Sequence, residues 1–99
     1  MAVTKAKLVD VIAKRTGLTK KETQAVIDGF LTTVSYGLQR GTRVELRGFG
    51  NFKVVHRNAR MARVPKSNEP VYVAEHDTVV FRPSQKLKDY INKRTKEKD

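Results

Sequence analysis

The sequence contains no cysteine and no tryptophan among its 99 residues. Without cysteine, neither a disulfide bond nor a thiolate metal site can support a small domain. Its hydrophobic runs are only a few residues long, whereas a membrane-spanning helix needs about 20 apolar residues. The N-terminal segment MAVTKAKLVD also lacks the apolar stretch and cleavage site of a signal peptide. We therefore expect a cytoplasmic protein of one small domain, for which association with a second copy is the ordinary source of further stability.

Acidic residues are few compared with basic ones. Lys and Arg total 21 against 10 Asp and Glu, which gives a formal net charge of +11. Such an excess of positive charge attracts polyanions, and its self-repulsion destabilises a compact chain that has no anionic partner. Nucleic acid is the first candidate partner, and an anionic membrane surface is the second.

Groups that could carry catalysis are also missing. His56 and His76 have no cysteine and no metal-ligand spacing near them, and Ser35, Ser67 and Ser84 lack the context of a nucleophile elbow. The sequence therefore predicts no enzyme activity, no catalytic residue, no bound metal, no cofactor and no small-molecule substrate. We expect His56 to be a solvated or phosphate-facing side chain.

Apolar spacing predicts two helices in the first part of the chain. The first covers residues 4–16, with Thr4 as its N-cap and Gly17 as the left-handed residue that ends it. The second begins at the capping box TKKE of residues 19–22 and runs until Gly41. Its apolar stripe is wide for so small a domain and continues almost to the helix end, which disfavours a helix-turn-helix motif. The residues of this stripe are Val26, Ile27, Phe30, Leu31, Val34 and Leu38.

The hydrophobic period then changes to two, as in β-strands. Apolar and charged residues alternate over residues 43–47, and both glycines of GFGNF (48–52) suit a tight turn with positive φ. β-forming residues recur on both sides of a polar stretch at 57–70, and Ser84 can cap a last helix. We expect an α+β fold with two N-terminal helices, a three-stranded antiparallel sheet, a long ribbon between the second and third strands, and a C-terminal helix.

The polar stretch RNARMARVPKSNEP (57–70) offers almost nothing to a hydrophobic core. A solvated, flexible loop is the simplest interpretation. Three features favour an extended ribbon instead: β-forming residues flank the stretch, it exceeds the roughly two to five residues of a hairpin connection, and Pro65 pushes Val64 toward an extended backbone. An apolar Val-Pro pair at the end of a cationic ribbon suits a wedge between stacked bases.

The sequence resembles the HU/IHF family of bacterial DNA-bending proteins over nearly its whole length. The motifs that carry the resemblance are KAKLVDVIA, GLTKKE, GFGNF, RNARMARVP and FRPSQKLKDYIN. Where the family commonly has Arg-Asn-Pro-x-Thr-Gly, this chain has RVPKSN, with Val64 in place of Asn and Asn68 in place of the turn glycine. Asn tolerates the left-handed conformation that such a turn needs. Members of the family kink DNA by inserting apolar wedges from the minor groove.

The resemblance implies an intertwined dimer with one β-ribbon arm per subunit in the minor groove of double-stranded DNA. The dimer is built of like chains, with a heterodimer containing a paralogue as the alternative. In the dimer core the resemblance places Phe30, Leu31, Val34, Phe49, Phe52 and Phe81. It assigns DNA contacts to Lys53, Arg57, Arg60, Arg63, Val64, Pro65, Lys66, Arg82, Lys86 and Lys88. Pro65 is the intercalating residue in this scheme.

The resemblance also divides a single domain of residues 1–99 into functional parts and implies a protein of the bacterial nucleoid. The parts are a helical dimerisation part (1–41), a sheet and arm (42–83, with the arm at about 54–78), a closing helix (84–94) and a tail (95–99).

We therefore expect an architectural protein that binds duplex DNA largely without sequence specificity and bends or compacts it. An IHF-like subunit with sequence preference is the main alternative, and the motif FRPSQ leans toward it. An RNA-binding basic module would need exposed aromatic residues for base stacking, and only Tyr72 lies near the arm. A membrane-surface protein would need a basic amphipathic helix, whereas the long helix is nearly uncharged after Lys21 on its polar face.

Overall fold

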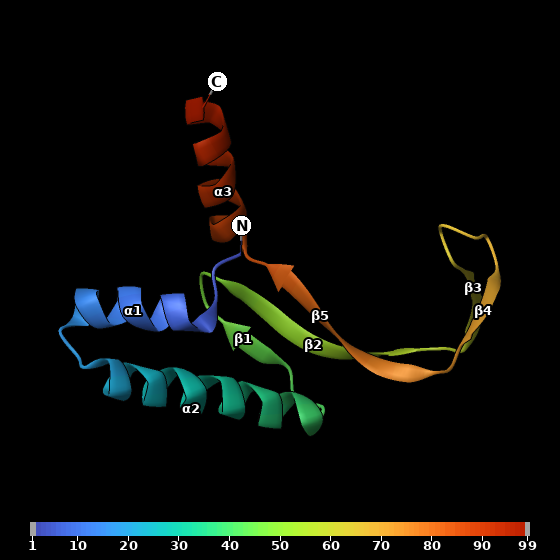
Figure 1. Cartoon of the computed structure of the whole chain (residues 1–99), viewed down its shortest axis with the longest axis horizontal. Coiled ribbons are helices and arrows are strands. Elements are labelled where there is room, and N and C mark those ends of the chain that lie inside the picture. The colour runs from blue at the N-terminus through green and yellow to red at the C-terminus, as the bar shows by residue number, and fades with distance from the viewer. Residues whose placement is uncertain (1, 99) are drawn as a thin grey trace. The chain divides into compact units, whose positions relative to one another are not determined.

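The computed structural model describes residues 2–98 and, of these, the side chains as far as Lys93. Over these residues the chain forms three helices and five antiparallel strands (Figure 1), which confirms the expected α+β class. In chain order the elements are α1 (Lys5–Thr16), α2 (Lys20–Gln39), β1 (Val44–Leu46), β2 (Gly50–Arg57), β3 (Arg60–Arg63), β4 (Pro70–Val73), β5 (His76–Pro83) and α3 (Gln85–Lys98).

A boundary after Tyr36 divides the chain into two compact units. The first unit holds α1 and most of α2. Thr4 caps α1 as expected, because its Oγ1 accepts a hydrogen bond from the Lys7 amide at 3.2 Å. Gly17 ends the helix in the left-handed conformation, with φ of 79°, and its amide donates to the Ala13 carbonyl. Both ends of α1 thus follow from local sequence chemistry.

The start of α2 is the expected capping box. The Glu22 amide donates to Thr19 Oγ1 at 3.0 Å, and the Thr19 amide donates to the Glu22 carboxylate at 2.9 Å. The hydrogen bond from the Thr19 amide lowers the pKa of the Glu22 carboxyl group. Beside this cap lies the small core of the first unit, formed by Val9, Ala13 and Thr23. The Thr23 hydroxyl is satisfied by donation to the Thr19 carbonyl at 2.9 Å.

Ion pairs at the surface join α1 to α2. Lys5 Nζ lies 2.7 Å from Asp28 Oδ1, and Lys20 Nζ lies 3.2 Å from Asp10 Oδ1. The hydrogen bond from Lys20 lowers the pKa of Asp10. Exposed pairs of this kind contribute roughly 0–1 kcal/mol each, so they orient the two helices more than they stabilise them.

The second unit contains a three-stranded sheet in the order β1-β2-β5. Its α3 starts directly after β5, where Ser84 Oγ accepts from the Leu87 amide at 3.1 Å, as expected of a cap. The Ser84 amide also donates to the Phe49 carbonyl at 2.9 Å, which ties the start of α3 to the turn between β1 and β2. The helix continues to Lys98, beyond the expected end at residue 94, because no glycine or proline follows Ser84 in the sequence.

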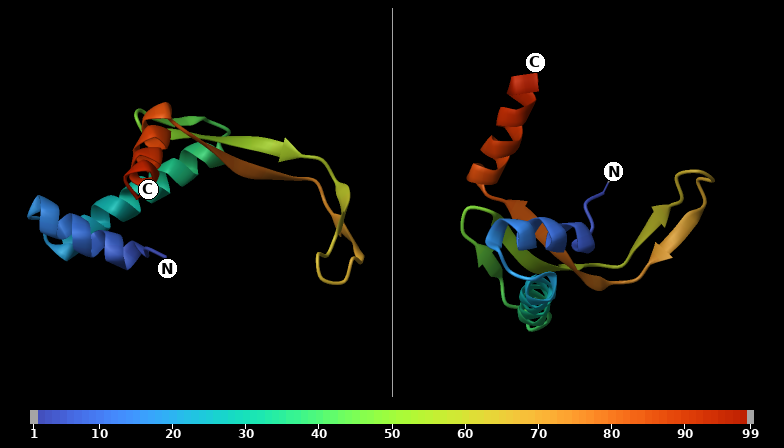
Figure 2. Two further views of the ribbon diagram at one scale, coloured as in Figure 1. Left: turned by 90° about the horizontal axis from the view of Figure 1, so that it is seen from above. Right: turned by 60° about the vertical axis from the view of Figure 1, so that its left-hand side comes forward.

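Beyond the sheet, β2 and β5 continue into a second, two-stranded sheet formed by β3 and β4. Figures 1 and 2 show this as one long ribbon that leaves the sheet along β2 and returns along β5. The expected order of strands, with the ribbon between the second and third strands of the sheet, is confirmed.

The two glycines of the GFGNF turn serve different purposes. Gly48 has φ of 82°, as the turn requires, and the Phe49 amide closes the turn by donating to the Leu46 carbonyl at 2.9 Å. The prediction of positive φ at Gly50 is wrong. Gly50 is needed because β5 approaches closely: a Cβ there would lie 2.5 Å from the Phe81 ring and 2.6 Å from the Arg82 carbonyl oxygen.

This close approach predicts that Gly50→Ala destabilises the protein by about 1–3 kcal/mol, because the Phe81 ring and the β5 backbone must shift to admit a methyl group. Gly37→Ala is the matched control. A Cβ at Gly37, inside α2, would make ordinary contact with Val44 at 3.6 Å, so alanine should stabilise by about 0.5–1 kcal/mol. Urea unfolding at one fixed protein concentration measures both. Equal stability of Gly50→Ala and the parent chain would contradict the packing described here.

Candidate nucleic-acid interface

The pairing of β2 with β5 sorts their side chains onto two faces. Opposed residues of an antiparallel pair point to the same face, and the faces alternate along each strand. Phe52 with Phe81 and Val54 with Val79 therefore lie on one face, the apolar face. On it the Phe81 ring centroid lies 4.7 Å from that of Phe52 and 5.4 Å from that of Phe49. The apolar face thus carries an aromatic cluster at the start of the ribbon.

The opposite face of the same strands carries positive charge. Lys53 is opposed to Val80, Arg57 to His76, and Arg82 to Asn51. None of these three cations has a carboxylate partner in the described part of the chain. We call this the cationic face. It unites three of the expected DNA contacts, Lys53, Arg57 and Arg82, on one side of two paired strands.

The closing helix α3 carries the two lysines that were expected to contact DNA. Lys86 and Lys88 are exposed in the first turns of α3. The Lys86 aliphatic stem runs past the turn between β1 and β2, with its Cδ 3.7 Å from where a Cβ on Gly48 would be. The start of α3 therefore adds two solvent-exposed cations close to the end of β5.

The ribbon of β3 and β4 ends in an ordered turn. The Val64 amide donates to the Glu69 carbonyl at 2.9 Å, and the Asn68 amide donates to the Val64 carbonyl at 2.7 Å. Asn68 has φ of 59°, the expected left-handed conformation, and its carbonyl accepts from Arg63 Nη1 at 3.0 Å. This hairpin holds Val64, Pro65 and Lys66 exposed at the tip.

The ribbon presents its arginines on both faces. Arg60 is opposed to Val73 and Arg63 to Pro70, and because the two arginines are three residues apart, they point to opposite sides of the strand. Arg57 belongs to β2, before a break at Asn58. As the sequence indicated, the three arm arginines do not share one face.

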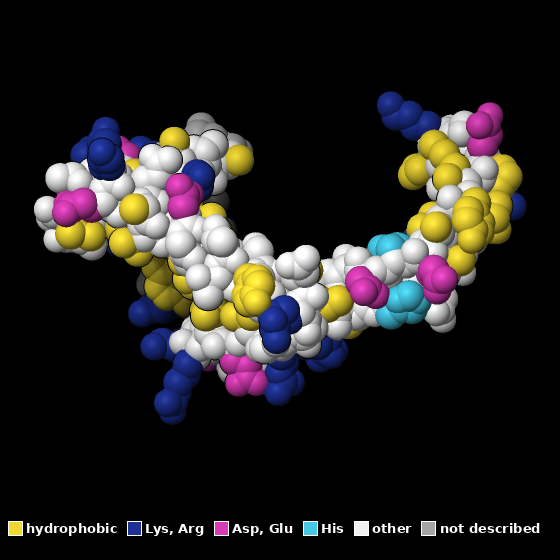
Figure 3. Space-filling model, turned by 90° about the horizontal axis from the view of Figure 1, so that it is seen from below, with side chains coloured by type: hydrophobic (Ala, Val, Ile, Leu, Met, Phe, Trp, Pro, Cys, Tyr) yellow, Lys and Arg dark blue, Asp and Glu magenta, His cyan; other side chains and the backbone are white. Residues whose placement is uncertain are grey.

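Sequence reasoning missed two side chains of the ribbon, Met61 and Tyr72. They are opposed in the register, on the face that also carries Arg63, and they are 63% and 66% exposed. Figure 3 shows the hydrophobic side chains gathered at the ribbon end (right). The alternation within RMAR and PVYV is the signal that could have revealed this pair.

His56 is exposed to solvent and bridges two carboxylates on the side of the apolar face. Its Nδ1 lies 2.9 Å from Asp77 Oδ1 and its Nε2 lies 3.1 Å from Glu75 Oε2. The hydrogen bond to Asp77, followed by that to Glu75, raises the pKa of His56. A neutral imidazole has a single N–H, so only the imidazolium donates to both acids. The side chain is solvent-exposed, as expected, but the sequence did not reveal its partners, because they lie 19 and 21 residues away along the chain.

Neither a metal site nor a membrane-spanning helix is found among the described residues. Across residues 2–98, no three His, Cys, Asp or Glu side chains are grouped so that they could hold a metal ion. Over the same part of the chain, no helix has the length and apolar character needed to cross a membrane.

Comparison with known proteins agrees with this geometry. The family model described as bacterial DNA-binding protein matches residues 3–92. Integration host factor subunit alpha from Stenotrophomonas maltophilia (strain K279a) is 37% identical over 91 residues, which cover 92% of this chain and 92% of the relative. The protein of the same name from Xanthomonas campestris pv. campestris (strain B100) has the same identity and coverage.

Solved structures give the same result. The HU chain of an Anabaena HU–DNA cocrystal structure superimposes with a TM-score of 0.78 at 32% identity, over 89% of this chain and 96% of that chain. HU from Thermotoga maritima gives a TM-score of 0.64 at 27% identity, over 89% and 97%.

A basic β-ribbon chain of this fold is a DNA-binding architectural protein. The chain belongs to the HU/IHF family of bacterial DNA-binding proteins. Proteins of this family bind DNA as dimers and are not enzymes.

The two carboxylates bonded to His56 allow a prediction of how its pKa responds when either one is removed. Because its pKa is raised, the bridge stabilises the ribbon below the ordinary pKa of histidine and is lost as pH rises through the folded value. Asp77→Asn should return the pKa of His56 toward its ordinary value, and Glu75→Gln should lower it less, since Asp77 is the stronger cause. NMR titration of the imidazole ring measures both variants. An unchanged His56 midpoint in Asp77→Asn would rule out the bridge.

Proposed function

We propose that the chain is an architectural protein that binds duplex DNA largely without sequence specificity and bends or compacts it in the bacterial nucleoid. The observation that carries this proposal is the cationic face of β2 and β5, continued by a ribbon with arginines on both faces and an apolar tip. Phosphate contacts supply most of the affinity of such a surface and carry no sequence information.

The tip supports bending in addition to binding. Val64 and Pro65 are exposed where the ribbon ends, and the hydrogen bonds of Val64 to Glu69 and Asn68 hold the turn in shape. A pre-formed apolar tip can be pushed between base pairs at a cost of a few kcal/mol for each unstacked step, and the wrapping that a kink permits offsets that cost. Pro65 is the intercalating residue in this proposal, and Val64 inserts beside it.

Sequence preference is the second candidate property. Relatives at 37% identity are named integration host factor subunit alpha, which favours an IHF-like subunit with a preferred site. Such preference can arise from how readily the DNA deforms, without base contacts. Comparing affinity for random duplexes with affinity for defined sites selected from a random pool separates the two candidates.

A dimer is the second part of the proposal. In α2, Phe30 and Leu31 are 49% and 47% exposed, and in the sheet Phe49 and Phe81 are 47% and 37% exposed. Isolated apolar residues on a surface are common, but contiguous large ones mark an interaction site. We propose that a second copy covers these faces, with Val34 and Phe52 in the same shared core. A paralogous chain is the alternative partner, consistent with relatives that are named as a subunit.

In this proposal both compact units belong to one DNA-binding domain. The helical part supplies dimer contacts, and the sheet and arm supply DNA contacts. Lys53, Arg57 and Arg82 hold DNA along the cationic face, and Lys86 and Lys88 hold flanking DNA beside it. The remaining contacts, in the arm, are Arg60, Arg63 and Lys66.

In the proposed dimer Phe30 is buried against the second copy, so Phe30→Ala should destabilise by about 3–5 kcal/mol. Tyr72→Ala is the matched control: it removes an aromatic side chain that is also exposed in the single chain, but lies on the ribbon. It should change stability by less than about 0.5 kcal/mol. Thermal unfolding followed at several protein concentrations also reports the dimer, since its Tm rises with concentration. Equal effects of the two variants together with a concentration-independent Tm would exclude the dimer.

Substitutions of the arm arginines and of the tip residues should impair DNA binding in different ways. If about 6–10 phosphates are neutralised, affinity for duplex DNA falls roughly 10³- to 10⁵-fold between about 50 and 200 mM salt. Arg60→Ala should weaken binding to every duplex and make this salt dependence shallower, by about 0.9 in log–log slope for each phosphate that the variant leaves unneutralised. Pro65→Ala carries no charge change, so its salt dependence should match that of the parent chain.

The same pair of variants separates bending from binding. Pro65→Ala should reduce the bend measured by energy transfer between dyes at the duplex ends, and its affinity should fall least on nicked DNA, where a kink costs less. Val64→Asn combined with Pro65→Ala removes both apolar groups of the tip. If this double variant bends intact DNA as sharply as the parent chain, the tip is no wedge and the arm acts only through charge.

A further inference from the structure

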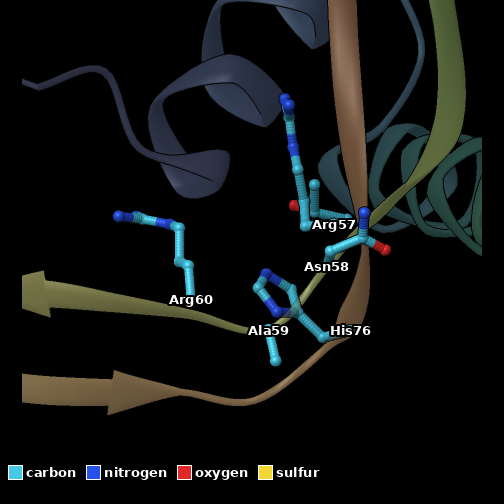
Figure 4. Close-up of a pocket in the computed structure, with 6 residues that line it drawn as sticks. Arg57, Asn58, Ala59, Arg60 and His76 are labelled. Carbon is cyan, nitrogen blue, oxygen red and sulfur yellow. The ribbon is translucent and has the colours of Figure 1, made fainter.

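The ribbon contains a pocket at the break between its two sheets. It has a volume of about 440 Å³, lies open to solvent, and is lined by Arg57, Asn58, Ala59, Arg60, His76 and Thr78. Arg57 comes from the end of β2, Arg60 from the start of β3 and His76 from the start of β5. In the view of Figure 4 the His76 ring lies below Arg57 and to the right of Arg60, and the two arginine side chains extend from their strands in different directions. A local interruption of the strands therefore places two arginines and a histidine along the lining of one open space.

A hydrogen bond to the backbone orients the His76 ring. Its Nδ1 lies 2.8 Å from the Ala74 carbonyl oxygen. A carbonyl only accepts, so Nδ1 carries a proton in both charge states of the ring, and Nε2 is the atom that gains or loses one. Neutral His76 offers a lone pair at Nε2, whereas protonated His76 offers an N–H and a positive charge. Its ability to bind an anion therefore depends on pH.

The charges around the pocket favour an anion. No carboxylate lines it, and neither Arg57 nor Arg60 has an ion-pair partner in the described part of the chain. The two acids that flank His76 in sequence, Glu75 and Asp77, are both engaged by His56.

The register keeps the two histidines apart. His76 is opposed to Arg57, whereas Asp77 is opposed to His56, so the two pairs point to opposite faces of the ribbon. Further along the face of His76, β2 contributes Lys53 and β5 contributes Arg82. Both are cations. The acid on this face of the three-stranded sheet, Glu45 of β1, is opposed to Asn51 and is paired with Arg43 at 2.9 Å.

We propose that this pocket binds a backbone phosphate of duplex DNA between Arg57 and Arg60, with protonated His76 as a third cationic ligand, so that DNA affinity rises on acidification. The proposal rests on the proposed function and adds His76 to the expected DNA contacts. The bound phosphate stabilises the imidazolium, so phosphate binding is coupled to the uptake of a proton at Nε2 of His76. Each site then contributes at most a tenfold change in affinity for each pH unit.

The experiment uses the full chain and a random-sequence duplex, with affinity measured from pH 5.5 to 8 at constant ionic strength. The parent chain should bind more tightly at the low end of this range. His76→Gln should flatten the dependence and bind at every pH about as the parent chain does at pH 8. His56→Gln is the matched control, the same substitution on the opposite face of the ribbon, and should retain the dependence.

A third variant separates the charge from the shape of the side chain. His76→Lys supplies a cation that does not titrate in this range, so it should bind at pH 8 as tightly as the parent chain binds at pH 5.5. At pH 5.5 the log–log salt slope of the parent should exceed that of His76→Gln, and the difference should vanish at pH 8. A variant that merely disturbed the fold would not produce this pattern.

The outcomes distinguish this proposal from the one it rests on. If the parent chain binds no duplex at any pH, the proposed function fails, and the phosphate pocket fails with it. If the parent binds duplex but His76→Gln keeps the full pH dependence, the pocket alone is overturned. Loss of the dependence in His56→Gln instead would also overturn it and assign the effect to the bridge with Asp77 and Glu75.

Discussion

The register of β2 against β5 is the constraint on which the rest of the structure depends. It opposes Phe52 to Phe81 and Arg57 to His76, and because side chains alternate between faces, one set of hydrogen bonds separates an apolar face from a cationic face. A shift of the register by one residue would exchange the two faces of one strand. Gly50 helps to hold this register, since a side chain there would collide with β5. In the proposed complex, this backbone feature determines which surface meets a partner chain and which meets DNA.

The second constraint is how little the single chain buries. Within residues 2–93, whose exposure is described, only Val9 and Ala13 among hydrophobic side chains are buried, while aromatic residues of α2 and of the sheet stay partly exposed. Conformational entropy opposes folding by roughly 1–2 kcal/mol for each ordered residue, and two small buried side chains cannot offset that. The proposed second copy would cover the exposed apolar area, so that dimerisation accompanies folding and the ribbon stays free to contact DNA.

Helix ends and the turn at the tip of the arm could be predicted from the sequence because they follow from local chemistry. The cap at Thr4, the reciprocal bonds of Thr19 with Glu22, and the left-handed Asn68 each involve residues a few positions apart. The features that could not be predicted all join distant parts of the chain. The contact of Gly50 with β5 and the bridge from His56 to the opposed strand depend on a register that no single-strand pattern specifies. Resemblance to a family identified the class, but it did not reveal these chain-specific contacts.

The ribbon shows why its apolar side chains are available for a partner. A two-stranded ribbon has no interior, and in water it is marginally stable by itself. This one is held by backbone pairing, by the turn at Asn68 and by the polar bridge of His56, not by packing. Met61 and Tyr72 therefore remain exposed, although burying their apolar surface would be favourable. A minor groove offers sugar surfaces to such side chains and phosphates to the arginines beside them. In the proposed complex, the arm therefore uses for DNA the side chains that an ordinary hairpin would pack within its own fold.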